Sequence, residues 1–387
     1  SSLNLKVLLS FRLLYARYSC VRWELPTILD NFVSLYFIRL ITRTEQSRIF
    51  LYIFLVHRSQ YLKPSNANPC CYTELVRLVR MKIAVIGAGG VGGYFGARLA
   101  AAGEDVSFIQ RGAHFLAMKE QGLRVDSKLG NIVLNAVKVT EDASEIGPVD
   151  IVLVAVKSGQ TDAAAALCKP LLRQNTGVIT LQNGVENEER LSERIGCDHV
   201  LGGVVYILSL IESPGIIRHS GEMARIEFGE LDGSESKRGQ SFLSACRRAS
   251  IEAELTNNIL TSLWRKFIFL CPHNGLTALT RSAIGRVRED PDCRALLEEA
   301  VLEVIELASA KGIGVTSTDV SSFMERYDGL PESMTSSMHH DVVNGKPLEL
   351  DWLNGAVVRL AREHGIGTPV NQFIYAALKL FRSGTAQ

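Results

Sequence analysis

The chain has 387 residues, which is too long for one ordinary domain and predicts two or three domains with sizeable cores. It is 47% hydrophobic and 21% charged, as is typical of a globular protein. The formal net charge is only +1, so the composition gives no reason to expect nucleic acid or an anionic membrane surface as a partner.

The charge is divided unevenly between the first 80 residues and the rest. Residues 1–80 carry 11 Lys and Arg against 4 Asp and Glu, net +7, whereas the remainder carries 31 against 37, net −6. Arginines interrupt the apolar runs of this segment before they reach the ~20 residues that span a bilayer. We therefore interpret residues 1–80 as an atypical basic extension outside the fold, with Met81 as the true start. A targeting segment is the alternative.

The eight cysteines show no CxxC spacing, and no Cys/His pattern has the spacing of a zinc site. Scattered thiols without a disulfide framework are typical of a reducing compartment. We expect a cytoplasmic protein that spans no membrane and binds no metal.

A glycine-rich motif follows the first apolar run after Met81. Residues 83–86 are typical of a buried parallel strand, and Gly87, Gly89 and Gly92 then form GxGxxG before a helix expected over 91–102. The first glycine permits a tight turn, the second lets the backbone approach a pyrophosphate, and the third allows close packing of helix and strand. The setting favours a dinucleotide site over a simple turn.

The end of the second strand, expected over 105–109, indicates which dinucleotide is bound. An enzyme that uses NAD usually has an acidic residue here to hold the ribose 2′-hydroxyl, but this chain has Gln110 and Arg111. A guanidinium can pair with a 2′-phosphate, so NADPH is favoured over NADH. The alternative is that Arg111 is a solvated loop charge.

Alternating strands and helices predict a doubly wound, mostly parallel sheet up to about residue 257. Further strands are expected over 150–156, 177–181 and 200–206, helices over 160–172 and 186–195, and a small antiparallel insertion over 122–139 that turns at Leu129 and Gly130. Lys157 and Asn183 follow two of the strands, at the edge of the sheet where ligands bind.

The second part of the chain has long helical periods, with helices expected over 292–311, 348–364 and 371–382. The fold class is thus an α/β Rossmann domain (81–257) followed by an all-α C-terminal domain (258–387). An active site is expected in the cleft between them.

One lysine in the helical part suits acid–base chemistry. Lys266 stands among apolar neighbours, and burial lowers a lysine pKa toward the range where the ammonium can donate a proton at neutral pH. A lysine that merely extends from a core helix is the alternative. Asn274 follows beyond Pro272, which should kink the helix near 268–271. Spacing alone leaves the roles of Lys266, Asn274, Glu349 and Ser337 open.

These stretches together resemble the ketopantoate reductase family over essentially all of residues 81–387. The resemblance rests on separated motifs in the same order: 81–93, 181–184 (Leu-Gln-Asn-Gly), 263–267 (Leu-Trp-Arg-Lys-Phe), 274–279, 336–338 and 349–351 with Asn354 and Gly355. It implies NADPH-dependent reduction of 2-dehydropantoate (ketopantoate) to pantoate in pantothenate and coenzyme A biosynthesis, a small 2-keto acid as substrate, and a homodimer as the assembly to consider.

The resemblance also implies roles for individual residues. Lys266 matches the catalytic lysine that protonates the substrate oxygen, and Glu349 matches the acid that assists it. Substrate-binding positions are Asn183, Asn274 and Ser337. Positions expected to contact the cofactor are Gly87, Gly89, Gly90, Val91, Gly92, Arg111, Lys157, Gln160 and Asn183.

The chain departs from the family at Leu270, where many members have a second asparagine that can hydrogen-bond a substrate hydroxyl. Loss of one such bond can change preference among 2-keto acids by ~1–3 kcal/mol. Reduction of another 2-keto acid is therefore an alternative, as are a non-catalytic NADPH sensor and a dehydrogenase that oxidises a hydroxy acid or an amino-acid conjugate with NAD.

Overall fold

The computed structural model describes residues 80–384, and the fold given below is that of these residues. They belong to one structural unit, Val79–Gln387. The interpretation of residues 1–80 as an extension lies outside the described residues, apart from Arg80. Within the described part, no helix combines the length and the apolar character that crossing a membrane requires.

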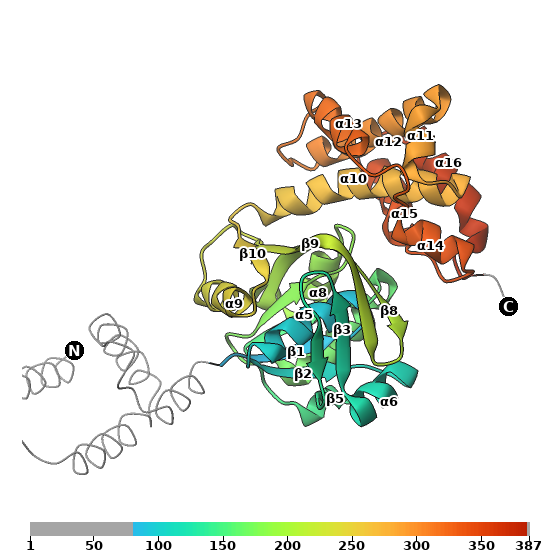
Figure 1. The fold of residues 1–387 in the computed structure, drawn as a ribbon. Helices are drawn as coiled ribbons and strands as arrows, with labels where there is room; N and C mark the ends of the chain where they lie inside the picture. Colours follow the sequence, from blue (N-terminus) through green and yellow to red (C-terminus); the bar gives the residue numbers. More distant parts are fainter. Residues whose placement is uncertain (1–79, 385–387) are drawn as a thin grey trace, which may run out of the picture. The chain divides into compact units, whose positions relative to one another are not determined.

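The predicted doubly wound, mostly parallel sheet is confirmed (Figure 1). Its central strands run parallel in the order β7-β6-β1-β2: β7 (Gly177–Thr180), β6 (Ile151–Val154), β1 (Lys82–Ile86) and β2 (Asp105–Ile109). Side chains alternate across β1, so Ile83 and Val85 enter the core on one face of the sheet, and Ala84 and Ile86 enter the core on the other. Both faces are thus covered, as a parallel sheet requires.

The sheet extends beyond the central strands further than the sequence predicts. β8 (Val200–Ser213) and β9 (Ile216–Glu230) form a long antiparallel hairpin, whereas a strand ending at residue 206 was expected. β3 (Leu123–Ser127) and β4 (Ile132–Leu134) form the expected antiparallel pair, but β3 joins the main sheet through β9 and is not a separate insertion. Two edge strands complete the sheet, β5 (Lys138–Thr140) beside β2 and β10 (Glu252–Leu255) beside β9.

Helices connect the strands of the sheet. They are α5 (Gly90–Ala101), α6 (Gly112–Gln121), α7 (Thr161–Cys168), α8 (Asn187–Ile195) and α9 (Lys237–Arg248). Small residues let α5 lie close to the sheet, since a Cβ at Gly96 would approach the Phe108 ring to 2.4 Å. Helix α9, which was not predicted, follows β9 and packs beside β10.

The helical C-terminal region begins with α10 (Ile259–Thr280), which packs against β8 and β9 as well as against other helices (Figure 1). The helix continues through Pro272. The remaining helices are α11 (Ile284–Glu289), α12 (Pro291–Ala310), α13 (Val320–Asp328), α14 (Ser337–Val343), α15 (Asn354–Glu363) and α16 (Pro369–Leu378). The prediction of a single helix over 348–364 was wrong, because a 3-10 turn at Leu350–Trp352 and a non-helical Leu353 precede α15.

Candidate active site

The glycine motif forms a tight turn between β1 and α5. Gly87 has a φ of +91°, and its N–H donates to the Ile109 carbonyl at 2.9 Å. A Cβ at Gly92 would lie 2.1 Å from the Gly87 carbonyl oxygen, so only glycine fits there. The Cβ position of Gly89 has no heavy atom within 4 Å, which leaves open space in front of the first turn of α5. The turn therefore fits a pyrophosphate at a helix N-terminus.

The start of α5 also approaches β8, which the sequence analysis did not reveal. A Cβ at Gly90 would lie 2.3 Å from the Ser209 carbonyl oxygen, whereas the next residue, Val91, is half-buried. Gly90 is thus required by backbone packing and lies beside the open space at Gly89.

Two side chains whose roles could not be predicted from the sequence hold this turn. Gln110 accepts a hydrogen bond from the Ala88 N–H at 2.9 Å, and His114 contacts the Ala88 carbonyl through Nε2 at 2.9 Å. His114 Nδ1 accepts from the Gly215 N–H at 2.9 Å, so Nε2 carries the proton. Burial lowers the pKa of His114 despite its bond to Ala88, which favours this neutral form.

Arg111 lies exposed at the start of α6, at the carboxyl end of β2. Gln160 is also exposed, immediately before α7. Lys157, three residues earlier, pairs with carboxylates from the helical region, at 2.9 Å from Asp341 and 3.5 Å from Glu349. Partial burial lowers the pKa of Lys157, but these two carboxylates outweigh that effect and the pKa is raised.

Lys266 lies on α10 and reaches the loop after β7. Its Nζ donates a hydrogen bond to Asn183 Oδ1 at 2.8 Å, and the side chain is half-buried. Burial lowers the Lys266 pKa to about 8, the charge of Glu349 opposes this shift, and Arg326 adds to it. The lysine thus lies at the carboxyl edge of the sheet as an ammonium that can release a proton near neutral pH.

Hydrogen bonds to the backbone carbonyl of Asn183 hold this residue in place. Its carbonyl accepts hydrogen bonds from Ser158 Oγ at 2.8 Å and from Asn187 Nδ2 at 2.9 Å. The side-chain oxygen is therefore fixed where Lys266 meets it. No side chain or carbonyl within residues 80–384 accepts a hydrogen bond from the NH₂ group, which can therefore donate to a ligand.

Glu349 lies at the same edge but does not contact Lys266 directly. Its Oε1 accepts from the Ser158 N–H at 3.0 Å and from Ser158 Oγ at 3.2 Å, and only 12% of its side chain is exposed. Glu349 therefore acts on Lys266 through its charge, since it raises the lysine pKa.

Asn274 and Ser337 lie next to each other in the structure. Asn274 is on α10, eight residues beyond Lys266, and Ser337 is the first residue of α14. The Oδ1 of the buried Asn274 accepts from Ser337 Oγ at 3.2 Å and from the Met338 N–H at 3.1 Å. Its Nδ2 donates to the Leu270 carbonyl at 2.9 Å. Asn274 thus fixes the start of α14, and the exposed Ser337 is the member of the pair that a ligand can reach.

Four further residues at this site were not predicted from the sequence: Ser158, Asp341, Arg326 and Tyr206. Ser158 directly follows Lys157 in a loop at the carboxyl end of a strand, so the rule that found Lys157 could have found it too. No sequence signal marks Asp341 or Arg326, which are single charged residues on amphipathic helices. Across residues 80–384, no group of three or more His, Cys, Asp or Glu side chains is arranged to hold a metal ion.

Comparisons with known proteins identify the same family in both parts of the chain. Residues 83–233 match the family model "Ketopantoate reductase PanE/ApbA", and residues 258–382 match "Ketopantoate reductase PanE/ApbA C terminal". The chain is 32% identical to the 2-dehydropantoate 2-reductase of Mesorhizobium japonicum over 77% of its own length and 97% of that relative. It is 28% identical to the uncharacterized oxidoreductase YkpB of Bacillus subtilis, over 78% of this chain and 99% of that relative.

A solved structure gives the same likeness in three dimensions. The crystal structure of 2-dehydropantoate 2-reductase from Geobacter metallireducens is similar with a TM-score of 0.72 at 32% identity. The similarity covers 77% of this chain and 99% of that one.

Proposed function

The chain belongs to the ketopantoate reductase family, and from that premise we propose that it reduces 2-dehydropantoate (ketopantoate) to pantoate with NADPH, in pantothenate and coenzyme A biosynthesis. Proteins of this family are oxidoreductases that act on a CH–OH group with a nicotinamide cofactor. The observation that carries the proposal is the hydrogen bond from Lys266 to Asn183, which holds an ammonium with a pKa of about 8 at the carboxyl edge of a dinucleotide-binding sheet.

The proposed reaction needs one proton and one hydride. NADPH, when bound, supplies the hydride that forms the new C–H bond at the keto carbon. Lys266 gives a proton from Nζ to the keto oxygen as the C=O double bond becomes a single bond, and the resulting amine later regains a proton from solvent. The nearby charge of Glu349 favours the ammonium before transfer and its restoration afterwards.

We also propose a role for each residue that is expected to bind the cofactor. We propose that Gly87, Gly89, Gly90, Val91 and Gly92 receive the pyrophosphate, and that Arg111 pairs with a 2′-phosphate. Lys157, Gln160 and Asn183 are proposed to line the nicotinamide end. Support for the glycine set comes from the open space at Gly89, and support for Arg111 from its exposed position after β2.

Asn183, Asn274 and Ser337 are the proposed substrate-binding residues. The NH₂ group of Asn183 can donate to a substrate oxygen. The exposed hydroxyl of Ser337 gives its proton to Asn274, so it can accept from a substrate hydroxyl, and the bonds of Asn274 to Ser337 and Met338 set the position of that hydroxyl.

Leu270 supports one alternative, the reduction of a different 2-keto acid by the same chemistry. It is half-buried one turn after Lys266, and its apolar side chain cannot bond a substrate hydroxyl. A 2-keto acid with an apolar group in place of the hydroxymethyl group of ketopantoate would suit this position better.

We also propose that the Rossmann domain spans residues 81–257 and the helical domain residues 258–387, and that the protein is a cytoplasmic homodimer. The start of α10 at Ile259 and the two separate family matches support the domain limits. Light scattering on the purified protein would measure the assembly.

The test is an assay of the purified chain with NADPH and NADH against a panel of 2-keto acids that includes ketopantoate. We expect NADPH oxidation with ketopantoate, reduced by about 10²- to 10⁴-fold in Lys266→Ala, because a general acid contributes that much. Lys311→Ala, an exposed lysine at the end of α12, is the matched control and should retain full activity. Turnover of another keto acid alone would support the alternative, and NADPH binding without any turnover would indicate a sensor.

A further inference from the structure

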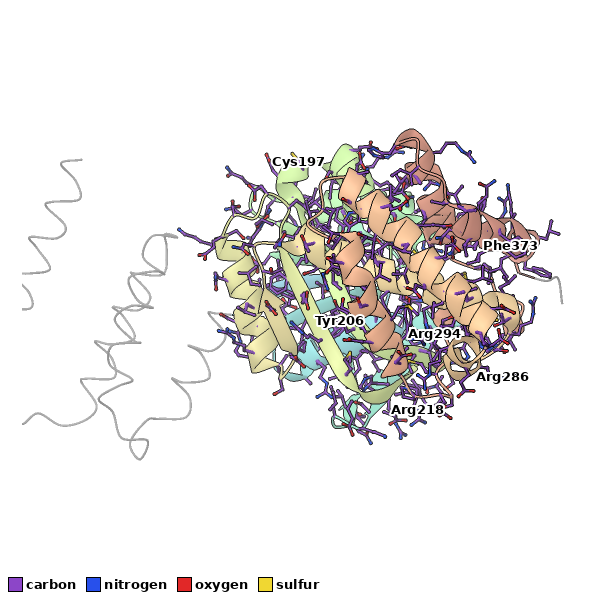
Figure 2. The ribbon with its side chains drawn as sticks, turned by 90° about the horizontal axis from the view of Figure 1, so that it is seen from above. Cys197, Tyr206, Arg218, Arg286, Arg294 and Phe373 are labelled. Atoms are coloured by element: carbon purple, nitrogen blue, oxygen red, sulfur yellow. The ribbon has the colours of Figure 1, made fainter. Side chains whose placement is uncertain are left out.

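Two positively charged side chains lie beside the ring of Tyr206 on β8. The Nζ of Lys266 and the Cζ of Arg326 are each 5.9 Å from the ring centroid, so the two cations are separated by at most twice that distance. Tyr206, labelled in Figure 2, is half-buried where side chains of α10 and α13 reach β8. Arg326 therefore belongs to the surroundings of the proposed proton donor.

The Arg326 guanidinium has aromatic neighbours but no carboxylate partner. Its Cζ lies 4.4 Å from the Phe269 ring centroid, and within residues 80–384 it makes no ion pair. Two other arginines that contact α13 or its N-terminal end do have partners, since Arg265 pairs with Asp319 at 3.1 Å and Arg294 with Asp328 at 2.7 Å. The charge of Arg326 is thus left available beside the site.

The two cations repel each other, and this repulsion favours an anion at the site. Burial is the larger effect that lowers the Lys266 pKa, and Arg326 lowers it further. The one nearby carboxylate that opposes the shift, Glu349, is already held by Ser158 and Lys157. An anion bound near both cations would therefore be stabilised by each of them.

We propose that Arg326 binds the carboxylate of the substrate and so selects 2-keto acids over uncharged ketones. This inference rests on the proposed function and names what that site recognises. In a 2-keto acid the carboxylate is bonded directly to the keto carbon, so one small molecule can present its keto oxygen to Lys266 and its carboxylate to Arg326. A guanidinium holds a carboxylate through two parallel hydrogen bonds, which also fixes the orientation of the keto group.

The alternative is that Arg326 only stacks on Phe269 and Tyr206 and stabilises the packing of α13. That role predicts equal effects of a substitution on charged and uncharged substrates. The experiment therefore compares the 2-keto acid that the wild type reduces best with the methyl ester of the same acid.

Arg326→Gln removes the charge, Arg326→Lys keeps it without the planar fork, and Arg265→Gln is the matched control. Arg265 also lies over a phenylalanine ring, at 5.3 Å from Phe323, but its charge is paired with Asp319. In Arg326→Gln we expect KM for the acid to rise about 10- to 100-fold, as for loss of a charged hydrogen bond, with a smaller change in kcat. KM for the ester should stay the same, Arg326→Lys should be intermediate, and Arg265→Gln should resemble the wild type.

Each outcome decides between the possibilities. An unchanged preference for acid over ester in Arg326→Gln would overturn the inference while leaving the proposed function standing. If the wild type turns over no keto acid, the proposed function fails, and calorimetric titration with pyruvate in the presence of NADP⁺ then decides the inference. Pyruvate binding that Arg326→Gln abolishes would support the role of Arg326, whereas binding that is absent, or that is unaffected by the substitution, would refute it.

Discussion

Glu349 accepts hydrogen bonds from both the backbone N–H and the Oγ of Ser158, at 3.0 and 3.2 Å. Ser158 Oγ also lies 2.8 Å from the Asn183 carbonyl, so the single proton of this hydroxyl is shared between the two oxygens. One serine thus links the acid proposed to assist Lys266 and the loop that carries the hydrogen-bond partner of Lys266.

Replacement of Ser158 should weaken catalysis without unfolding the protein. Ser158→Ala keeps the N–H bond to Glu349 but removes the hydroxyl that also holds the Asn183 loop. We expect kcat/KM for the keto acid to fall about tenfold, the effect of one hydrogen bond to a charged group. Steady-state kinetics measure this, with Ser244→Ala as control because that exposed hydroxyl bonds the Gln240 carbonyl of its own helix. Equal activity of both variants would contradict the prediction.

The pH dependence of reduction should report Lys266. Proton donation requires the ammonium, whose pKa burial lowers to about 8, so kcat/KM should be constant below that pH and fall as the pH rises through it. Glu349 raises this pKa, so Glu349→Gln should move the falling limb to lower pH. A limb that stays in place or moves upward in Glu349→Gln would show that another group controls the profile.

Two adjacent glycines should give opposite results when changed to alanine. A Cβ at Gly90 would meet the Ser209 backbone at 2.3 Å, so Gly90→Ala should destabilise the fold by roughly 1–3 kcal/mol through overpacking. Gly89 has open space at its Cβ position and a φ of −69°, so Gly89→Ala should unfold like the wild type but bind NADPH more weakly. Thermal unfolding and fluorescence titration measure the two effects. Equal loss of stability in both variants would be inconsistent with this geometry.

Arg111 should determine the choice of dinucleotide. If its guanidinium pairs with the 2′-phosphate, Arg111→Gln should raise the Kd for NADPH about 10- to 100-fold and leave the Kd for NADH unchanged. Arg247→Gln, an exposed arginine on α9, is the control for charge alone. A similar rise in the Kd for both cofactors would show that Arg111 has a different role.

The central fold could be predicted from sequence because its signals are local. The buried strand 83–86 with its glycine motif, and the strand 105–109, were each found within one residue of the observed limits. The second half of the hairpin could not be predicted, since residues of β8 beyond Tyr206 become increasingly exposed and lose the continuous apolar character of a central strand. The break at Leu353 was missed because the apolar spacing continues across it.

The site was predictable only in part, for a related reason. Lys266 and Asn183 follow local signals, an apolar helix and a strand end, and they proved to be in contact. The partners of Glu349 could not be read from local sequence, because Ser158 and Lys157 lie in a distant part of the chain. The roles of Asp341 and Arg326 could not be predicted for the same reason.

The distance in sequence between Ser158 and Glu349 has a consequence for folding. The two residues are 191 positions apart, whereas Lys266 and Asn183 are 83 apart. Contacts that close long loops form after local ones, so the carboxylate should reach Ser158 among the last events of folding. During refolding, secondary structure measured by far-UV circular dichroism should therefore recover before enzymatic activity, and a chain cut before residue 349 should lose catalysis even where its sheet survives.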